Sequence, residues 1–538
     1  MRKRPHVIAS THVRIDSHTP RAAGRNVTLV GLAAVLAKLM GLGEKLTLAF
    51  YFGAGPSADA YFVVTSFVVG AGTLARSLTE PVMLPLFVRC LHTQGETARA
   101  WSLFRWFLFC TIAVLGLTAA FVVARPAAFL CFLAPGLATA AVPHALPMLR
   151  LGSLAAIFYG ASAVTESALH GLGRFGFPAL AELVYRALLI VACRAAGVGN
   201  FGVLALGVGI LVGAAARFVL ELAAIRDRGV DLIPPVGPRR SPVATSLWLL
   251  WPLFFGVLFH LVGETIETRL ASLAGPGAIA ARLYAKKIVE LPVLLAPYVL
   301  GVVGLPYLTR LCALGNWTAV ARLSAIAARW ISAVFVLLGL LIASFSRPVI
   351  VMLLAHGHFS ASGVTATSRV LSVYALGLPI LAMEALLVPI FYAAGDTGTP
   401  SWVGAVGVTL NILGVMSLAP AYGINGIAAA LVFSKAAKMV ILTGCLKKYL
   451  PVQFSQLARQ AAILLAALVP ATTVALCVRV TSPMTGNGTL RLAGGLSIAS
   501  IIVCSVFAIC YYAGCRVIAR WHGDRQPFPH GPEGARRT

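Results

Sequence analysis

Apolar segments of about 20 residues, separated by short polar or Gly/Pro-rich breaks, run through almost the whole chain, and a helix of that length crosses a hydrocarbon core of about 30 Å. The pattern predicts fourteen membrane-spanning helices, at residues 28–52, 60–88, 103–124, 148–171, 177–196, 202–225, 244–271, 278–304, 327–354, 367–393, 401–419, 424–446, 459–479 and 490–515. Residues 127–141 contain Pro135, with further prolines just beyond, and indicate an interfacial helix.

The same order of segments occurs twice. Four short motifs recur in order after 220 to 224 residues: Ala54–Ser57 as Ala274–Gly277, Leu84–Arg89 as Leu305–Arg310, Gly173–Pro178 as Gly395–Pro400, and Gly199–Val203 as Gly423–Ile427. Such a duplication in an apolar chain is typical of transporters built from two homologous halves. Each copy holds six predicted spans, an even number, so we expect both halves to have the same orientation and to enclose a central cavity.

Composition supports the same class of protein. Hydrophobic residues make up 59% of the 538 residues and charged residues only 11%, whereas a soluble domain has roughly 25% charged residues. Polar stretches reach only about twenty to thirty residues, which leaves no room for a separate soluble catalytic domain. The predicted fold is therefore an all-α polytopic membrane protein, not an enzyme, with two pseudo-symmetric six-helix lobes and two further C-terminal helices.

The predicted spans divide the chain into six parts. They are a basic cytoplasmic segment (1–27), an N-lobe of spans 1–6 (28–225), a cytoplasmic linker (226–243), a C-lobe of spans 7–12 (244–446), spans 13 and 14 (459–515) and a cytoplasmic tail (516–538).

Positive charge is distributed unevenly between the loops. Lys and Arg concentrate in alternate loops, whereas the loops at 53–59, 272–278 and 356–366 contain none. By the positive-inside rule both termini are cytoplasmic. The net charge of +26 is then explained by orientation and by attraction to membrane lipids, and no nucleic-acid partner is expected. The ten cysteines form no C-x-x-C pair, and no metal site is predicted.

Acidic side chains occur where the pattern predicts membrane. Eight of the 17 acidic residues fall in or near predicted spans: Glu44, Glu80, Glu166, Glu182, Glu264, Glu267, Glu290 and Glu384. An unpaired charge at the bilayer centre costs roughly 2.5–3.5 kcal/mol, so each must face a partner or water. Helical i,i+4 spacing predicts three local pairs: Arg76–Glu80, Glu182–Arg186 and Lys286–Glu290.

Cations gather in corresponding helices of the two repeats. Spans 1, 2, 7 and 8 carry Lys38, Lys45, Arg76, Arg269, Lys286 and Lys287. Ammonium and guanidinium groups in a low-dielectric cavity make strong charge-assisted bonds to phosphate oxygens. Lys38, Lys45, Arg76, Lys286 and Lys287 are therefore the candidate ligands of a phosphorylated substrate, and salt-bridged packing is the alternative.

Two further acids are candidate gating residues. Glu384 is the single acid of span 10, between Pro379 and Pro389. It fits a proton or cation site, or alternatively a carboxylate satisfied by neighbouring backbone. Asp59 follows Gly55-Pro56-Ser57 and is predicted to cap the helix of span 2.

Three motifs resemble one known family. Gly53-Ala54-Gly55-Pro56-Ser57-Ala58-Asp59-Ala60-Tyr61-Phe62 is similar to the first extracytoplasmic turn of the lipid II flippases, the MurJ (formerly MviN) family of the multidrug/oligosaccharidyl-lipid/polysaccharide exporter superfamily. Tyr284-Ala285-Lys286-Lys287-Ile288-Val289-Glu290-Leu291-Pro292 resembles that family's Tyr-Ala-Asp-Arg-x-x-Glu-x-Pro segment, and Gly395–Pro400 its Gly-Asp-Thr-x-Thr-Pro loop. The likeness extends from about Leu29 to about Leu450, and the family's fourteen spans match the predicted number.

The resemblance implies a flippase of the bacterial inner membrane. It would carry undecaprenyl-pyrophosphate-linked disaccharide-pentapeptide, lipid II, to the outer leaflet for peptidoglycan synthesis, by alternating access, as a monomer and without a cofactor. Family residues around the pyrophosphate fall on Lys38, Arg76 and Lys287, and a family acid of span 2 falls on Asp59. Glu290 would orient Lys287 or gate the cavity, and spans 13 and 14 would hold the polyprenyl tail.

The sequence departs from the family's pattern at several of these positions. A second first-span arginine falls on Glu44 or shifts to Lys45, Ala75 replaces a span 2 arginine, and Lys286 replaces the Asp of span 8. Lysine keeps the charge of arginine but loses bidentate phosphate geometry.

Rival functions differ in the chemistry they need. A flippase for another polyprenyl-linked oligosaccharide fits the same features, whereas a cationic cavity disfavours a drug or cation antiporter. A polyprenyl-phosphate enzyme needs acids clustered on aqueous loops, which hold almost none here. A scaffold that has lost transport is a further alternative. Membrane potential, protons and Na⁺ are all compatible as driving forces.

Overall fold

Local sequence signals mark the starts of several helices. Pro56 and Pro126 each occupy the first turn of a helix, where the missing N–H is not needed. Asn316 and Ser360 cap two other helices by accepting the backbone N–H of Ala319 and Gly363, both at 3.1 Å.

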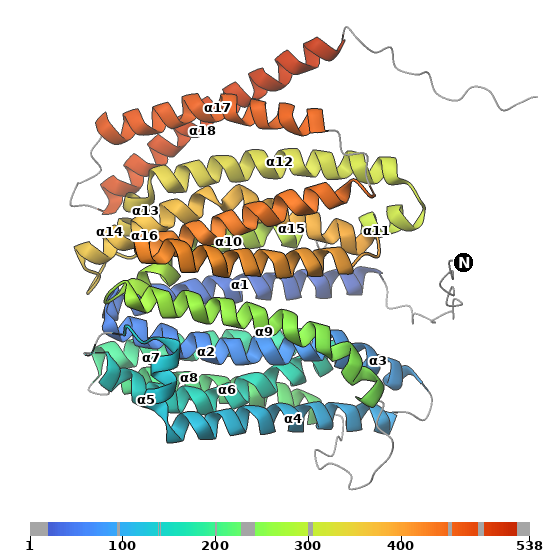
Figure 1. The fold of residues 1–538 in the computed structure, drawn as a ribbon, viewed down its shortest axis with the longest axis vertical. Helices are drawn as coiled ribbons and strands as arrows, with labels where there is room; N and C mark the ends of the chain where they lie inside the picture. Colours follow the sequence, from blue (N-terminus) through green and yellow to red (C-terminus); the bar gives the residue numbers. More distant parts are fainter. Residues whose placement is uncertain are drawn as a thin grey trace, which may run out of the picture.

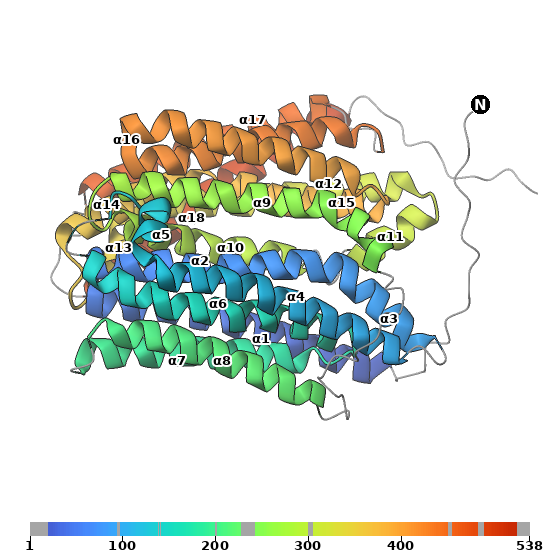
Figure 2. The ribbon, with the colours of Figure 1, turned by 60° about the horizontal axis from the view of Figure 1, so that its bottom comes forward.

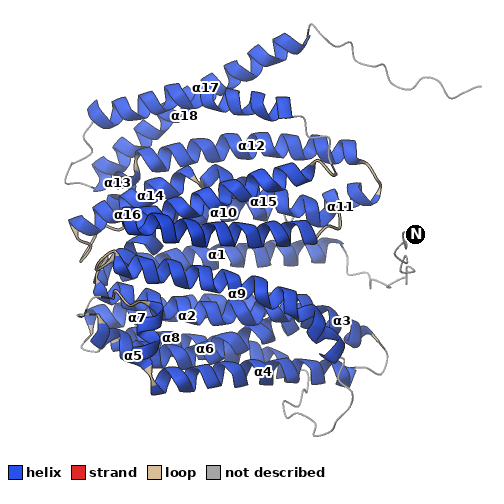
Figure 3. Cartoon of the chain, in the orientation of Figure 1, coloured by secondary structure: helices blue, strands red, loops and turns tan. Residues whose placement is uncertain are grey.

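The computed structural model describes residues 20–93, 97–137, 139, 141–199, 202–226, 243–299, 305–449, 454–481 and 489–523. These residues form helices joined by short loops, as Figure 3 shows, and they contain no strand.

The first bundle, the N-lobe, follows the first repeat. Its helices are α1 (Pro20–Phe52), α2 (Pro56–Leu78), the π-helical turn η1 (Thr79–Met83), α3 (Leu84–His92), α4 (Thr97–Ala124), the short α5 (Pro126–Leu133), α6 (Val142–Gly171), α7 (Gly176–Val198) and α8 (Leu204–Arg226). Figure 1 shows α2, α4, α6, α7 and α8 packed together on one side of the molecule. The predicted helix at 127–141 is confirmed only as the shorter α5.

The second bundle, the C-lobe, contains the second repeat. Its helices are α9 (Val243–Leu273), α10 (Ala278–Val299), α11 (Leu305–Ala313), α12 (Trp317–Ser344), α13 (Ser346–Leu353), α14 (Ala361–Leu376), α15 (Leu378–Ala393) and α16 (Gly398–Leu446). The last two helices, α17 (Phe454–Thr481) and α18 (Thr489–Gly523), pack on each other and against α12 and α13, outside both repeats. The two lobes with two added helices confirm the predicted fold class.

Each predicted span coincides with a helix or with consecutive helices. Span 2 comprises α2, η1 and α3, and spans 11 and 12 are the two parts of α16, which is kinked at Gly423. Within the described residues, eight helices are long and apolar enough to cross a membrane. Counting α14 and α15, which meet at 44°, as one bent span gives nine. The total of fourteen stays a prediction, as do the exact lobe boundaries, and most of the segments predicted at 1–27 and 226–243 lies outside the described residues.

The lobes touch through turns at one end of the molecule, on the left in Figures 1 and 2. The α1–α2 turn and the α9–α10 turn are the repeated Ala-Gly-Pro motifs, and both contain glycines with positive φ. His358 N–H donates to Phe50 C=O (2.9 Å) and Tyr284 O–H donates to Gly53 C=O (3.1 Å). Gly136 N–H donates to Ser272 Oγ (3.1 Å). This end, here called the turn end, is therefore closed by bonds between the lobes.

Gly277 allows the closest of these contacts. Its φ is +78°, and a Cβ there would overlap the carbonyl oxygen of Ala54 in the other lobe. Gly277→Ala is expected to lower the free energy of unfolding by about 1–3 kcal/mol more than Gly275→Ala, because of this overlap. Gly275 is the matched control: its φ is +113°, but a Cβ there would meet open space. Equal unfolding midpoints for the two variants would contradict this account.

Candidate functional site

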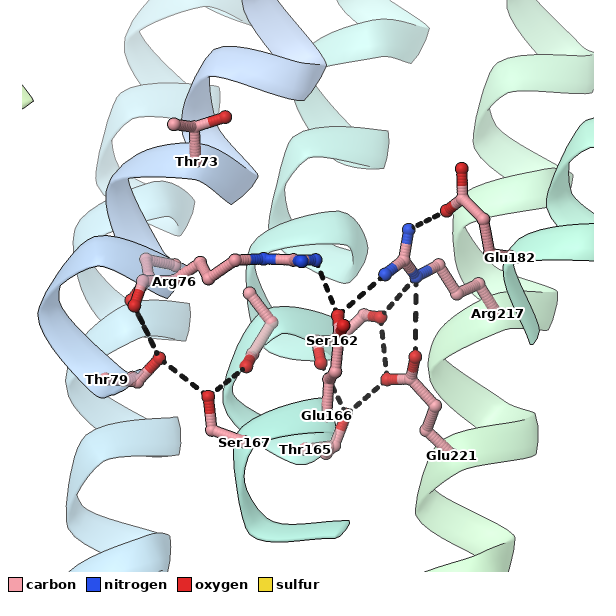
Figure 4. A network of polar contacts seen from close by, with 12 residues as sticks. Thr73, Arg76, Thr79, Ser162, Thr165, Glu166, Ser167, Glu182, Arg217 and Glu221 are labelled. Carbon is pink, nitrogen blue, oxygen red and sulfur yellow. Dashed lines mark hydrogen bonds and ion pairs between the residues drawn. The ribbon is translucent and has the colours of Figure 1, made fainter. Parts of the chain in front are cut away.

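A chain of ion pairs runs through the centre of the N-lobe, and Figure 4 shows its middle part. Glu166 on α6 accepts from Arg76 on α2 (2.5 Å) and from Arg217 on α8 (2.9 Å). Arg217, 3% exposed, also pairs with Glu182 of α7 and with Glu221 of its own helix (3.4 Å). The fully buried Glu221 accepts from two hydroxyls of α6 as well, those of Ser162 (2.7 Å) and Thr165 (2.6 Å).

The chain continues to α1. Arg186 on α7 donates to Glu182 (2.9 Å) and to Glu44 of α1 (2.8 Å). Glu44 is fully buried and also accepts from Lys45 (2.6 Å) and from the hydroxyl of Tyr61 (2.7 Å). We call this set the N-lobe charge network; its members are Lys45, Arg76, Arg186, Arg217, Glu44, Glu166, Glu182 and Glu221. Four cations balance four carboxylates, so the network is formally neutral and joins five helices.

Only one of the three predicted local pairs is confirmed. Glu182 and Arg186 do pair. Arg76 pairs with Glu166 rather than with Glu80, because Glu80 lies in the π-helical turn η1, where the side-chain register departs from 3.6 residues per turn. The predicted Lys286–Glu290 pair is also wrong: Lys286 lies 3.3 Å from Glu264.

Cations of both lobes meet beside α1. Lys287 of α10 lies against α1, the helix that carries Lys38 and Lys45, beside the side chain of Arg186. A Cβ on Gly41 of α1 would lie 3.8 Å from both the Arg186 and the Lys287 side chains, so side chains of the two lobes approach each other beside this residue. We call Lys38, Lys45, Arg186 and Lys287 the interlobe cation cluster.

The carboxylates neutralise this cluster incompletely. Glu44 and Glu182 pair with Lys45 and Arg186. Lys38 is exposed and makes no ion pair within the described part of the chain. Among the described residues, Lys287 pairs only with Glu290, at 3.8 Å, and the Glu290 side chain is 45% exposed. Two ammonium groups thus remain available to an anion at the interface between the lobes.

The structure separates two residues that the sequence grouped together. Lys286 and Lys287 are adjacent on α10, so their side chains point about 100° apart. Lys287 belongs to the interlobe cation cluster, whereas Lys286 lines a pocket in the C-lobe and a cavity between the two lobes. Arg76 reaches the cluster only through Glu166, Arg217 and Glu182, although its side chain is 39% exposed.

Glu384 does not pair with neighbouring backbone, as one alternative predicted. Its carboxylate lies 3.0 Å from Lys435 Nζ and 2.6 Å from Lys438 Nζ, both on the second part of α16. The acid of span 10 is therefore neutralised by two lysines.

Asp59 caps a helix of the other lobe. Its Oδ2 accepts from Gly277 N–H (2.6 Å) and its Oδ1 from Ala280 N–H (2.8 Å), at the start of α10. The predicted cap of its own helix is wrong, because α2 has no side-chain cap. In the second repeat, the residue that corresponds to Asp59 is Ile279, whose side chain cannot accept a hydrogen bond. The N-lobe therefore caps a helix of the C-lobe, and this position of the C-lobe cannot return the cap.

Removing this cap should loosen the turn end. Asp59→Ala leaves two N–H groups of the C-lobe without an acceptor, at a cost of about 1–2 kcal/mol. We expect amide hydrogen exchange in residues 277–280 to accelerate about five- to thirtyfold. Ser360→Ala is the matched control: it removes a cap within the C-lobe and should leave the exchange of the α9–α10 turn unchanged. Unaltered exchange in Asp59→Ala would refute the interlobe cap.

The Gly-Asp-Thr loop has a structural role. Asp396 accepts from the backbone N–H (2.9 Å) and hydroxyl (2.7 Å) of Thr399 and from the Tyr449 hydroxyl (2.8 Å). These bonds hold the pKa of Asp396 at about 2, below its usual value. In the first repeat Arg174 instead donates to Ala224 C=O (2.8 Å). Arg174 thus ties the α6–α7 loop to the end of α8, and Asp396 ties the α15–α16 loop to Tyr449 just after α16. The two repeats make the same kind of connection with different chemical groups.

Sequence reasoning missed five charged residues that form ion pairs in the two lobes: Arg217, Glu221, Arg282, Lys435 and Lys438. Arg217 and Glu221 are four apart in span 6, a signal that helical spacing offers. Arg282 on α10 pairs with Glu267 on α9 at 2.6 Å, and no local spacing indicates that pair. No group of three or more His, Cys, Asp or Glu that could hold a metal ion is present in the described ranges.

Comparisons with known proteins agree with one another. Residues 48–493 match the family model described as lipid II flippase MurJ. A protein of Rhizobium meliloti (strain 1021) named probable lipid II flippase MurJ is 27% identical over 426 residues, which cover 74% of this chain and 76% of the relative. The lipid II flippase MurJ of Burkholderia cenocepacia is 29% identical over 218 residues, covering 39% of this chain and 41% of the relative.

Two solved structures share the fold. One, described as lipid II flippase MurJ in an inward closed conformation, has a TM-score of 0.74 at 17% identity and covers 92% of this chain and 99% of its own. An inward-facing multidrug resistance transporter of the MATE family has a TM-score of 0.63 at 16% identity, covering 77% and 96%.

Proposed function

The chain belongs to the lipid II flippase MurJ family, and we propose that it carries lipid II from the inner to the outer leaflet of the bacterial cytoplasmic membrane for cell-wall synthesis. The observation that carries this proposal is the interlobe cation cluster. Lys38 and Lys287 come from opposite lobes; within the described residues Lys38 makes no ion pair and Lys287 makes a long one, to Glu290 at 3.8 Å, so both can still donate to an anion. A pyrophosphate between a sugar and a lipid is such an anion.

The N-lobe charge network holds the N-lobe side chains of this site in fixed orientations. Glu44 and Glu182 hold Arg186 in place, so its guanidinium is oriented before an anion arrives. Arg76 shares Glu166 with Arg217 and is exposed enough to contact the headgroup. Lys38 and Lys287 then supply the unneutralised charge, and Glu290 positions Lys287.

The turn end supplies a gate for alternating access. With both termini in the cytoplasm, the α1–α2 and α9–α10 turns face outward. The bonds from Asp59 and between His358 and Phe50 keep the outer end closed. Breaking them while the opposite end closes would expose the headgroup site to the outside. The polyprenyl tail stays in the bilayer beside α17 and α18, and one copy of the chain suffices.

Complementation and reconstitution test this function. We expect the chain to restore growth to a strain depleted of its own lipid II flippase. In proteoliposomes it should expose lipid II at the outer surface. A correctly inserted chain that moves another polyprenyl-linked oligosaccharide but not lipid II would refute the proposal. Imposed proton, Na⁺ or electrical gradients in the same vesicles would identify the driving force.

A further inference from the structure

The C-lobe contains a pocket lined by charged residues, between α9, α10 and the two parts of α16. Its volume is about 100 Å³, which is room for a few water-sized groups. Lys286, Lys435 and Lys438 line it together with Glu264, Glu267 and Asn411. We call it the C-lobe lysine pocket.

Cations exceed carboxylates around this pocket. Lys286 pairs with Glu264 at 3.3 Å, and Arg282 pairs with Glu267 at 2.6 Å. Lys435 and Lys438 share the single carboxylate of Glu384. Among the described residues, the ion pairs in and beside the pocket therefore join four cations to three carboxylates, and three of the cations line the pocket itself. Each ammonium group has three N–H donors, so the lysine pair retains donors for an additional anion.

Asn411 adds an unused acceptor. Its Nδ2 donates to Glu267 Oε1 at 2.7 Å, which fixes the amide orientation, since the flipped amide would place oxygen against a carboxylate. Its Oδ1 is buried and has no hydrogen-bond partner. A buried acceptor left unpaired costs free energy, so a ligand that brings an N–H gains from this position.

Small residues open the space beside the lysines. A Cβ on Gly407 would come within 3.3 Å of the Lys438 side chain, and one on Gly404 within 3.9 Å of its Nζ. Glycine at both positions lets Lys438 lie across the first part of α16 and reach Glu384. The pocket is thus shaped by four segments that the fold brings together.

We propose that the C-lobe lysine pocket binds the acidic peptide of the lipid-linked headgroup. Lys435 and Lys438 bind a peptide carboxylate, and Asn411 Oδ1 accepts a peptide N–H. This proposal rests on the proposed function and adds the part of the substrate that the C-lobe recognises. Lys286 lines the pocket while the next residue, Lys287, belongs to the interlobe cation cluster, so one headgroup can occupy both sites, with its pyrophosphate at the cluster and its peptide in the pocket.

Two lipids that differ only in the peptide test this assignment. One is lipid II with free peptide carboxylates, and the other is the same lipid with those carboxylates amidated. In proteoliposomes containing the full chain, we expect an apparent KM about tenfold lower for the free acid. Equal KM values for the two lipids would overturn the proposal, and this comparison needs no variant.

A charge-matched variant tests whether the C-lobe lysine pocket causes the lower KM for the free acid. The triple variant K435Q/K438Q/E384Q removes both lysines without leaving an unpaired carboxylate, and the KM ratio should fall from about ten to about one. Arg329→Gln removes an exposed cation of α12 and should leave the ratio at about ten. A triple variant that keeps the tenfold ratio would overturn the assignment to this pocket. Failure of the wild-type chain to move either lipid would instead refute the proposed function, and this inference with it.

Discussion

Replacing Arg217 with alanine is expected to lower the free energy of unfolding by about 3–5 kcal/mol. Arg217 is almost fully buried and bonds to three carboxylates and to the Ser162 hydroxyl. Its loss leaves Glu221, which is completely buried, with hydroxyl partners only. Removing one partner of a buried ion pair costs far more than the net contribution of the pair, because the remaining charge stays buried.

Denaturant titration of the purified full chain measures this loss. Arg226→Ala is the matched control, since Arg226 is the exposed last residue of the same helix, and it should change stability by no more than about 1 kcal/mol. If the two alanine variants unfold at the same denaturant concentration, Arg217 does not hold the N-lobe together.

Replacing Lys287 with alanine is expected to slow lipid II translocation at low substrate concentration by about 10- to 100-fold. A hydrogen bond to a charged group contributes about 1.5–3 kcal/mol, and Lys287 is the cluster's only cation from the C-lobe. Lys287→Arg should retain most of the rate because it keeps the charge and adds bidentate geometry.

The measurement is translocation in proteoliposomes with equal amounts of inserted protein. Arg329→Ala removes an exposed cation remote from the cluster and should transport normally. Glu290→Gln removes the carboxylate that pairs with Lys287, so it should disturb transport less than Lys287→Ala does. Undiminished transport by Lys287→Ala would remove this residue from the headgroup site.

Predictions from helical spacing were correct where the helix is regular, and they failed where the local geometry changes or where a partner distant in the chain lies closer. The pairing of Glu182 with Arg186 follows from helical geometry alone and is correct. The pairing of Arg76 with Glu80 uses the same rule and fails, because the π-helical turn changes the geometry locally. Asp59 has the position of a local cap but binds α10, some 220 residues later in the chain.

The helices, their duplication and the excess of positive charge could be predicted from the chain alone, because apolar length, repeat spacing and composition are local or additive properties. Which acid neutralises which cation became known only from the packing of the helices. Lys38 and Lys287 remain available, whereas Lys45 and Arg76 are paired, and Lys286 faces a different pocket. The physical reason is that an ion pair forms only within about 4 Å, and the packing of helices distant in the chain sets those distances.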